Sequence, residues 1–464
     1  MSLAATFDAQ LLARYDRPGP RYTSYPTAPC FHAAFGGQEL LEHAALSNAR
    51  PGKQPLSVYL HIPYCQSPCF YCGCNRLITR DAARGLEYTE LLLREIALLA
   101  PLFDRDREVV QLHLGGGTPN FLAAETLARL IAGLGNAFCL SRAPERDFSI
   151  ELDPRSVSEE YVAALAAIGF SRVSLGVQDF DPEVQRAVNR VQSVEQTLDL
   201  IDACRDHGFR SINVDLIYGL PRQTPAGFWH TLRTVISARP ERIAVYGYAH
   251  LPQLFKAQRR IDSAQLPDAA GRLELLRLAI EELSASGYRY IGMDHFALPD
   301  DELVRAQELG ELQRNFMGYT THASCDLIGV GMSAISHIGD SFSQNYRDLA
   351  SWEGALAAGR LPVWRGVALS DDDRLRGAVI GDLMCRGAID VPAIEARYGI
   401  EFAVYFREAL AQLAPYAADG LVRLDGKEIH ATACGRLLLR NLAMCFDKHL
   451  QAPASGAPAF SRVV

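Results

Sequence analysis

The sequence of 464 residues lacks the features that are typical of membrane proteins, secreted proteins and general nucleic-acid-binding proteins. It has no apolar run long enough to cross a membrane and no apolar stretch behind a positive charge near its N-terminus, so neither a membrane protein nor a secretory leader is predicted. Positive charge is scarce, because 46 Lys and Arg stand against 54 Asp and Glu and give a formal net charge of -8. General nucleic-acid binding needs a basic surface, so that class is disfavoured. We find no low-complexity segment, and no internal repeat beyond the strand and helix units described below.

The remaining composition is that of an ordinary globular protein. Hydrophobic residues make up 48% and charged residues 22% of the chain, which is long enough for one large domain and a smaller one. Eleven cysteines without regular spacing fit a reducing compartment better than a disulfide framework, so we predict a cytoplasmic protein. Seven of them are expected to be structural: Cys30, Cys139, Cys204, Cys325, Cys385, Cys434 and Cys445.

The other four cysteines lie together in the stretch SVYLHIPYCQSPCFYCGCN, residues 57–75. Cys65, Cys69 and Cys72 have a C-x3-C-x2-C spacing directly after a short β-branched and aromatic run, which predicts a strand followed by a loop. A 4Fe-4S cluster normally takes four thiolates, so three would leave one iron able to bind a group from outside the protein. Cys74 could supply the fourth ligand. A zinc site and a set of buried thiols are the alternatives, although no second cysteine knuckle or matching His pair follows.

Strands and helices alternate from residue 57 onward. This order predicts a parallel sheet with right-handed crossovers. The predicted strands span 57–62, 109–114, 147–152, 172–177, 211–217 and 242–248. The predicted helices span 85–99, 123–134, 158–168, 194–207 and 225–238.

Unusual residues lie at or near the end of each predicted strand, where ligand-binding residues cluster in such folds. In chain order they are the cysteine loop, the run GGGTP at 115–119, Glu151 with Asp153, Gln178, Asp215, and the run YAH at 248–250. The alignment predicts one shared site at the carboxyl ends of the strands.

Several of these residues have both a functional and a structural interpretation. Gly116 and Gly117 would let the backbone approach a ligand closely, but no Lys-Ser/Thr pair follows as in a phosphate-binding loop. Glu151 and Asp215 could accept hydrogen bonds from ribose hydroxyls or an amine, or cap the next helix. Arg190 could hold a carboxylate with two hydrogen bonds, or be a solvated charge on a helix.

The two ends of the chain are different in character from its middle. We divide it into an N-terminal arm at 1–50, a catalytic domain at 51–363 and a C-terminal domain at 364–464. The arm carries PGPRYTSYPTA at 18–28, which either docks on the surface or contacts a substrate.

Residues 329–334 loosely match a dinucleotide fingerprint, but no proper strand-turn-helix unit surrounds them. The C-terminal part is mostly helical, and Asp425-Gly426 predicts a hairpin turn of a winged-helix-like element with a lid or packing role.

The cysteine spacing, with YLHIP before it and GGGTP after it, resembles the radical S-adenosylmethionine superfamily. CFYCGCN and RPGPRYTSYPTA resemble one branch of it, the oxygen-independent coproporphyrinogen III oxidases, and the similarity runs from Tyr15 to Arg462. The resemblance implies an α/β fold: a partial, open (β/α)6 parallel barrel with an N-terminal arm and a mostly helical, winged-helix-like C-terminal domain.

The resemblance also implies a 4Fe-4S cluster and two molecules of S-adenosyl-L-methionine. The implied cluster ligands are Cys65, Cys69 and Cys72, while Cys74 is implied to lie near the second adenosylmethionine. The residues implied around the first adenosylmethionine are Tyr59, Gly116, Glu151, Ala249 and Ile335. Those implied around the second are Tyr71, Gly117, Thr118, Gln178, Arg190 and Asp215. The implied catalytic residues are Tyr59, Glu151, Met317 and Ile335.

The implied reaction converts two propionates of coproporphyrinogen III to vinyl groups and gives protoporphyrinogen IX. A reduced cluster would cleave adenosylmethionine to methionine and a 5′-deoxyadenosyl radical, which abstracts hydrogen from a propionate β-carbon before carbon dioxide leaves. Because the substrate carries four carboxylates, Arg21, Arg222 and Arg314 are candidate anchors. A donor such as flavodoxin or ferredoxin, and a monomeric state, are further expectations.

Two positions depart from the family pattern. Met317 stands where NFQGYTT has Gln, and Leu298 stands where Arg is expected, so the substrate contacts there are open. The main alternative function is a haem chaperone of the related family, although such proteins lack the PRYTSYPT arm and usually read C-x-F after the third cysteine. A winged-helix regulator with a redox cluster is disfavoured by the net charge.

Overall fold

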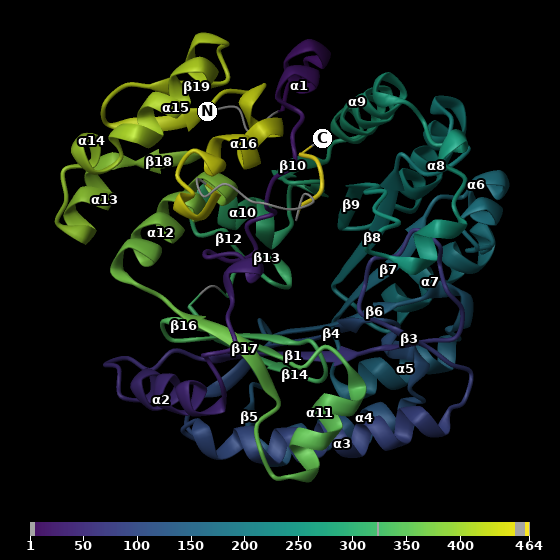
Figure 1. The fold of residues 1–464 in the computed structure, drawn as a ribbon. Coiled ribbons are helices and arrows are strands. Elements are labelled where there is room, and N and C mark those ends of the chain that lie inside the picture. The colour runs from purple at the N-terminus through teal and green to yellow at the C-terminus, as the bar shows by residue number, and fades with distance from the viewer. Residues whose placement is uncertain (1–4, 323, 451–459, 464) are drawn as a thin grey trace.

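The chain is built around one long curved sheet that wraps a central space (Figure 1). The computed structural model describes residues 5–322, 324–450 and 460–463. The strands of this sheet run in the order β10-β11-β9-β8-β7-β6-β4-β1-β14-β15-β16-β17, with β5 beside β4. Six consecutive strands are parallel: β1 (Leu56–Ile62), β4 (Glu108–Gly116), β6 (Asp147–Leu152), β7 (Arg172–Gln178), β8 (Ser211–Tyr218) and β9 (Arg242–Gly247). The end strands of the described sheet do not pair with each other, so the predicted open, partial barrel is confirmed.

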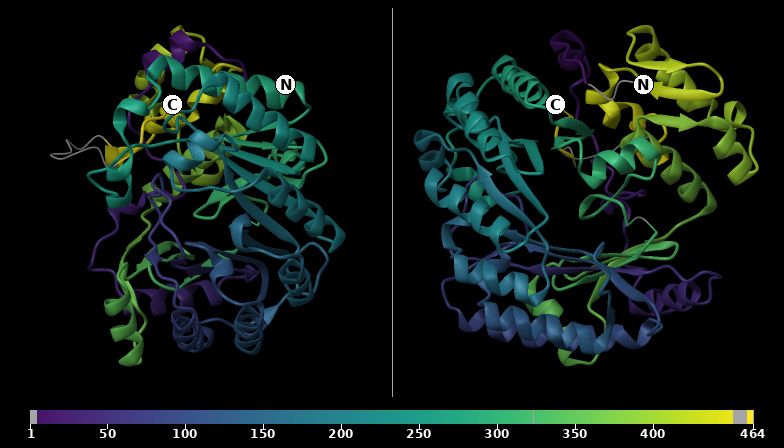
Figure 2. Two further views of the ribbon diagram at one scale, coloured as in Figure 1. Left: turned by 90° about the vertical axis from the view of Figure 1, so that its right-hand side faces the viewer. Right: turned by 180° about the vertical axis from the view of Figure 1, so that it is seen from behind.

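Helices cover the outer face of the parallel strands (Figures 1 and 2). They are α3 (Ala83–Leu99), α4 (Ala124–Ala137), α5 (Glu159–Ile168), α7 (Val194–Asp206), α8 (Pro225–Ala238) and α9 (Ala269–Ala285). Side-chain caps fix where several begin: Ser158, Ser193 and Thr224 accept backbone N–H groups of α5, α7 and α8. A short helix that was not predicted, α6 (Pro182–Ala187), follows β7.

Successive side chains of the parallel strands point to opposite faces of the sheet, so the outer face is apolar and the inner face is polar. In β6, Phe148, Ile150 and Leu152 are buried among the core residues, whereas Asp147 and Glu151 belong to the opposite row. The inner rows of the parallel strands enclose a space that we call the lumen, which retains a cavity of about 160 Å³. Its lining includes Gln111, His113, Asp147, Ser149, Glu151, Arg172, Ser174, Asn213, Asp215, Tyr246, His295 and Met317. The lumen is therefore built for polar ligands, not for a packed apolar core.

Ion pairs close the lumen at the amino ends of the strands. Arg172 pairs with Asp147 at 3.2 Å and also with Glu302, the first residue of α10 (Glu302–Leu309). Arg242 pairs with Asp301 at 2.8 Å and with Glu302 at 3.0 Å. Each guanidinium is matched by carboxylates, so these buried charges are compensated. A ligand must then enter from the carboxyl ends, where the predicted site lies.

Further strands extend the sheet beyond both ends of the parallel unit. On one side β14 (Asp326–Val330) lies parallel to β1, followed by antiparallel β15 (Ile335–Ile338), β16 (Ser341–Asn345) and β17 (Val363–Ala368). On the other side are β11 (His295–Ala297) and β10 (Arg289–Gly292). Residues 329–334 do not form a dinucleotide-binding turn, because β14 turns at Gly331 (φ +100°) into an antiparallel strand and not into a helix. The predicted boundary at 363/364 falls within β17, and the division into domains remains a prediction.

The N-terminal arm contains two helices that the sequence did not predict, α1 (Ala9–Tyr15) and α2 (Gly37–Asn48). Between them an extended segment crosses the molecule, as the views from two sides show (Figures 1 and 2). It is held by an Arg21–Asp294 ion pair and by a 3.0 Å hydrogen bond from the Tyr22 hydroxyl to Asp447. Residues 1–4 of the predicted arm lie outside the described residues.

The C-terminal part is mostly helical, as expected. Its helices are α12 (Asp371–Arg386), α13 (Val391–Tyr398), α14 (Phe402–Tyr405), α15 (Arg407–Ala418) and α16 (Leu439–Met444). A small antiparallel sheet joins β18 (Ala388–Asp390), β20 (Glu428–Ala431) and β19 (Val422–Leu424), and the predicted Asp425-Gly426 turn connects the last two. Residues 451–459 and 464 of this predicted domain are outside the described part.

The remaining elements are short. They are β2 (Tyr64–Cys65), β3 (Leu77–Ile78), β5 (Cys139–Leu140), β12 (Gln313–Asn315), β13 (Gly318–Thr320) and α11 (Leu349–Ala357). Among the helices of the described residues, none has the length and apolar character needed to span a membrane.

Candidate active site

The cysteine loop begins where β1 ends and is closed at its base by backbone pairing. Leu77 N–H donates to Pro63 O at 2.8 Å, and Thr79 N–H donates to Cys65 O at 3.0 Å. Inside the loop, the Arg76 guanidinium donates to the carbonyls of Cys69 at 3.0 Å and Cys72 at 3.2 Å. The loop is thereby held as a compact turn with a cation at its base.

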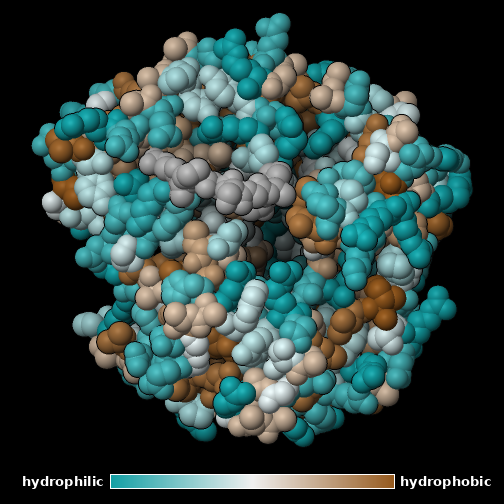
Figure 3. Space-filling model, viewed as in Figure 1, coloured by the Kyte–Doolittle hydropathy of each residue, from teal (hydrophilic) through white to brown (hydrophobic). Residues whose placement is uncertain are grey.

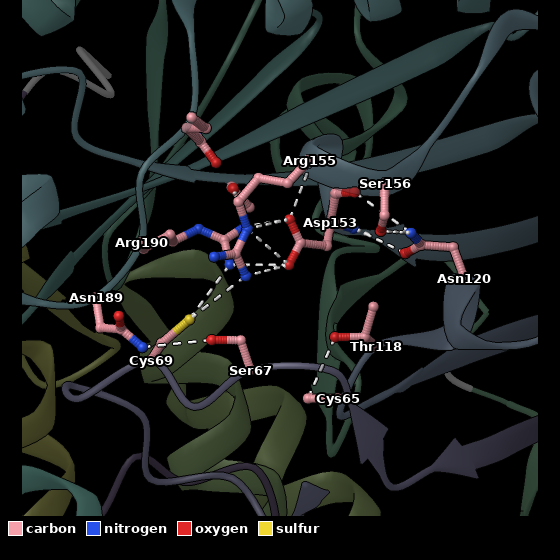
Figure 4. Close-up of polar contacts among 12 residues, drawn as sticks. Cys65, Ser67, Cys69, Thr118, Asn120, Asp153, Arg155, Ser156, Asn189 and Arg190 are labelled. Atoms are coloured by element: carbon pink, nitrogen blue, oxygen red, sulfur yellow. Dashed lines mark hydrogen bonds and ion pairs between the residues drawn. The ribbon is translucent and has the colours of Figure 1, made fainter. Parts of the chain in front are cut away.

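Each of the three predicted cluster ligands has a hydrogen-bond donor directed at its sulfur, and Figure 4 shows the donors at Cys65 and Cys69. Thr118 Oγ1 lies 3.2 Å from Cys65 Sγ, Arg190 Nη1 lies 3.5 Å from Cys69 Sγ, and the Cys74 amide lies 3.4 Å from Cys72 Sγ. Such donors favour the thiolate form, which is the form that binds metal, although at Cys65 burial outweighs the Thr118 hydrogen bond and raises the pKa to about 11. Hydrogen bonding from Cys74, with Arg76 and Arg190 nearby, lowers the pKa of the Cys72 thiol to about 6 against the cost of burial.

Two arginines link this loop to the end of β6. Arg155 Nη2 lies 2.6 Å from Asp153 Oδ2 and 3.8 Å from Cys69 Sγ, and Arg190 Nη1 lies 3.2 Å from the same carboxylate oxygen (Figure 4). Although burial opposes ionisation of Asp153, the Arg155 hydrogen bonds and the charge of Arg190 lower its pKa. Arg190 is 6% exposed, so its alternative interpretation as a solvated helix charge is wrong.

These residues fit a 4Fe-4S cluster. Three thiols project from one loop, and a cluster bound by three thiolates is negatively charged, which Arg76, Arg155 and Arg190 can offset. Within the described residues no three or more His, Cys, Asp and Glu side chains are grouped as ligands of a single metal ion. A cubane cluster binds its thiolates at separate corners, so its ligands need not converge on one point.

A chain of side chains connects β1, β4 and β6 across the lumen. Tyr59 Oη donates to His61 Nδ1 at 3.0 Å, because His61 Nε2–H donates to the Asn75 carbonyl at 2.9 Å. Burial lowers the pKa of His61, so its imidazole is neutral. The Tyr59 ring stacks on His113, whose Nε2 lies 3.3 Å from Glu151 Oε1.

Glu151 is held at both carboxylate oxygens. Gly116 N–H donates to Oε2 at 3.2 Å, while His113 contacts Oε1. Burial opposes ionisation, but the His113 and Gly116 hydrogen bonds lower the pKa of Glu151 below its ordinary value. The alternative role of Glu151 as a helix cap is not observed, because its oxygens bind these groups. His61 and His113 were missed at the sequence level, where the only sign was their spacing of two from Tyr59 and Gln111.

The glycine run approaches the cysteine loop very closely. Gly116 has φ +113°, and a Cβ there would lie 2.5 Å from the His61 ring. A Cβ on Gly117 would lie 2.6 Å from the Pro63 carbonyl. Both positions therefore require glycine because of protein contacts, and their implied contacts with adenosylmethionine remain predictions.

Asp215 is the corresponding acidic group on β8. Its oxygens accept from Ser174 Oγ at 3.0 Å and from Asn213 Nδ2 at 2.8 Å, so it does not cap a helix. Burial, reinforced by the negative charge of Glu151, raises the pKa of Asp215 to about 6. Asp215 thus loses its proton at a much higher pH than an ordinary aspartate.

This shift predicts a pH-dependent cost in stability. Because the folded-state pKa lies above the ordinary 3.8, ionising Asp215 destabilises the fold, with no cost below about pH 3.8 and the full cost, about 2–3 kcal/mol, above about pH 6. We expect the free energy of unfolding of Asp215→Asn, relative to wild type, to increase by about 1 kcal/mol between pH 5 and pH 7.5. Anaerobic urea unfolding at both pH values measures it, and a pH-independent difference would contradict the raised pKa.

The structure also places three more of the residues implied around the two adenosylmethionines. Ile335 on β15 lies across Gly329 from Tyr59, because its backbone approaches Gly329 of β14, which pairs with Tyr59 of β1. Ala249 and Tyr71 are joined through Gln258, whose Nε2 donates to both carbonyls, at 3.1 and 2.8 Å.

Gln178 and Met317 belong to two further elements of the chain. Gln178 ends β7 at φ +70°, with its amide beside Gly176 and Arg190. Met317 lies in the turn between β12 and β13, and its side chain lines the lumen without the amide that the family pattern has.

Of the three candidate carboxylate anchors, Arg21 and Arg314 lie close together, because Arg314 Nε donates to the Arg21 carbonyl at 3.4 Å. The Arg21 guanidinium is 5.6 Å from the Tyr246 ring centroid, and that of Arg314 is 4.8 Å from the Tyr319 ring centroid. Arg314 Nη1 is buried without a hydrogen-bond partner among the described residues. Arg222 is exposed and paired with Glu183 at 2.7 Å, so its surroundings are those of a surface ion pair. Figure 3 shows that the molecule is hollowed near the middle of the face drawn.

Comparisons with known proteins cover almost the whole chain. Residues 59–235 match the family model of the radical SAM superfamily, and residues 369–438 match that of the HemN C-terminal domain. Oxygen-independent coproporphyrinogen III oxidase of Pseudomonas aeruginosa is 49% identical over 99% of this chain and 99% of its own, and that of Escherichia coli K12 is 47% identical over 99% and 98%. The solved structure of coproporphyrinogen III oxidase (HemN) from Escherichia coli, described as a radical SAM enzyme, superposes with a TM-score of 0.91 at 46% identity and covers 96% of this chain and 100% of that one.

Proposed function

This chain belongs to the oxygen-independent coproporphyrinogen III oxidases, and we propose that it converts two propionates of coproporphyrinogen III to vinyl groups, giving protoporphyrinogen IX in haem biosynthesis. The observation that carries the proposal is the cysteine loop, with three thiols each facing a hydrogen-bond donor, placed beside the His61–Tyr59–His113–Glu151 chain. Both lie at the carboxyl ends of the parallel strands, where this class of fold binds its ligands.

Membership of the radical SAM superfamily implies a 4Fe-4S cluster and S-adenosyl-L-methionine. Cys65, Cys69 and Cys72 would hold the cluster, which when bound supplies the electron that cleaves adenosylmethionine into methionine and a hydrogen-abstracting 5′-deoxyadenosyl radical. Cys74 donates its amide to Cys72 and does not need to be a ligand. Two adenosylmethionines match the chemistry, because two propionates each lose one hydrogen atom.

The protein's own residues position the reactants. The Glu151 carboxylate stays ionised and can accept from an amine or a ribose hydroxyl, and Tyr59 is oriented by the neutral His61. Asp215, Gln178, Thr118, Gly117, Tyr71 and Arg190 would border the second adenosylmethionine. Arg21 and Arg314 would bind propionates of the substrate, because guanidinium groups pair with carboxylates through two parallel hydrogen bonds. Closure of the amino ends of the strands by ion pairs leaves one side of the lumen for substrate entry.

Three expectations about the cellular setting belong to the same proposal. The chain would work as a monomer in the cytoplasm, with a one-electron donor such as flavodoxin or ferredoxin. Support for a reducing compartment comes from the cysteines, all eleven of which are free thiols.

Anaerobic turnover tests the function. Reconstituted protein, reduced and given adenosylmethionine and coproporphyrinogen III, is expected to release methionine, 5′-deoxyadenosine and a divinyl porphyrinogen. Nucleoside release with untouched porphyrinogen would overturn the substrate assignment and leave the superfamily chemistry intact. Tight stoichiometric binding of haemin without porphyrinogen turnover would favour the haem-chaperone alternative.

A further inference from the structure

His295 presents an unfilled hydrogen-bond acceptor to the lumen. Its Nδ1 lies 2.8 Å from the Met293 carbonyl, which can only accept, so the ring proton is on Nδ1 and Nε2 carries a lone pair. His295 lines the lumen together with Tyr246 and Met317. Within the described residues Nε2 has no hydrogen-bond partner, whereas Glu151 and Asp215 already accept hydrogen bonds at both of their oxygens.

Packing fixes the direction of this imidazole. The His295 ring meets Tyr246 edge to face, with centroids 5.7 Å apart at 88°, and Tyr319 likewise at 5.4 Å and 83°. Two aromatic neighbours at right angles leave the ring little freedom to rotate. The lone pair of Nε2 is consequently held in one direction.

The backbone that carries His295 is strained. Met293 and Asp294 form the two-residue turn between β10 and β11 with φ +39° and +77°, although neither is glycine. This turn type normally uses Asn-Gly or similar pairs. Here it is stabilised by Val245 N–H, which donates to the Asp294 carbonyl at 2.7 Å, and by the ion pair of Asp294 with Arg21. Strain maintained by specific contacts is typical of a functional position.

The charges around His295 keep it neutral and place cations beside it. Burial, with the positive charge of Arg314 next in importance, lowers the pKa of His295 to about 4. A neutral imidazole with its proton turned away cannot donate to a carboxylate through Nε2. Its partner must be an N–H or O–H group, and the neighbouring Arg21 and Arg314 are suited to carboxylates.

We propose that His295 is a substrate-specificity residue whose Nε2 accepts a hydrogen bond from a pyrrole N–H of the tetrapyrrole. This inference rests on the proposed function. A porphyrinogen has four pyrrole N–H donors at its centre and carboxylates at its periphery, which matches a neutral acceptor flanked by guanidinium groups. No other role in the reaction is assigned to His295, because loss of hydrogen, carbon dioxide and an electron from a propionate requires no base there.

Equilibrium binding to reconstituted protein tests this role. Titrating coproporphyrinogen III anaerobically into wild type, His295→Gln and His295→Phe, we expect Kd to rise about 10-fold or more for His295→Phe, which keeps an aromatic ring but lacks an acceptor. His295→Gln retains an acceptor oxygen and is expected to stay within about threefold of wild type. His207→Gln, on the surface end of α7, is the control for a histidine replacement.

Two readouts distinguish loss of the Nε2 hydrogen bond from misfolding of a variant and from failure of the proposed function. Iron content and adenosylmethionine cleavage without porphyrinogen are expected to be unchanged in both variants, and His295→Leu replaces any phenylalanine variant that fails to load iron. A Kd for His295→Phe within threefold of wild type, or His295→Gln as weak as His295→Phe, would overturn the role of Nε2. If wild type binds the porphyrinogen but makes no divinyl product, the proposed function fails while the variants still decide the role of His295.

Discussion

Replacing Cys69 with serine is expected to abolish both the brown iron-sulfur chromophore and adenosylmethionine cleavage. Cys69 is buried in the cysteine loop, and its sulfur accepts from Arg190 at 3.5 Å and Arg155 at 3.8 Å. Loss of even the partners around a metal ligand typically costs 10- to 100-fold, so loss of the ligand itself is expected to lower cleavage by more than about 100-fold. Iron content, the visible spectrum and methionine release measure the effect after anaerobic reconstitution.

Two cysteine variants serve as matched controls for this experiment. Cys74→Ser tests the assignment of three ligands and not four, and it is expected to keep the chromophore, because Cys74 contributes its backbone amide to Cys72. Cys139→Ser changes an exposed cysteine at β5 and is expected to have no effect. Full iron loading and cleavage in Cys69→Ser would refute the ligand assignment, and loss of the cluster in Cys74→Ser would make Cys74 a fourth ligand.

Glu151→Gln is expected to lower kcat/KM for porphyrinogen oxidation by about 30- to 100-fold. Both Glu151 oxygens accept N–H donors, from Gly116 and His113, so an amide group would turn its own N–H₂ toward one of them. Loss of a charge-assisted hydrogen bond and a donor left unpaired together cost about 2–3 kcal/mol, which corresponds to this factor. Steady-state kinetics and the Kd for adenosylmethionine measure it, and iron content is expected to be unchanged.

Glu159→Gln is the control for this replacement, because Glu159 begins α5 and its side chain is 71% exposed. It is expected to leave kcat/KM within twofold of wild type. An equally small effect of Glu151→Gln would remove Glu151 from the active site.

The parallel unit could be predicted from sequence because its signals are local. Strand β6 and helix α8 have the predicted bounds, since apolar alternation and a Thr224 cap define them within a few residues of chain. The extension of the sheet by parallel β14 and antiparallel β15 to β17 could not be found that way. Its strands are short, and their pairing depends on β1 and on the turn at Gly331.

The site shows the same division between local and tertiary information. The cysteine spacing and the glycine run are contiguous in the chain and could be identified directly. His61 and His113 could not, because their roles depend on the register that places Tyr59 opposite His113 between β1 and β4. The departure at Leu298 is also explained by packing, since this residue packs against the main core.

The central claim is that a cluster held by Cys65, Cys69 and Cys72 keeps one iron free for adenosylmethionine. Electron paramagnetic resonance of the reduced, reconstituted protein, recorded before and after adding adenosylmethionine, tests this claim most directly. A 4Fe-4S signal whose shape changes on addition is expected, in wild type and in Cys74→Ser alike. A 4Fe-4S signal that adenosylmethionine leaves unaltered in wild type would contradict it.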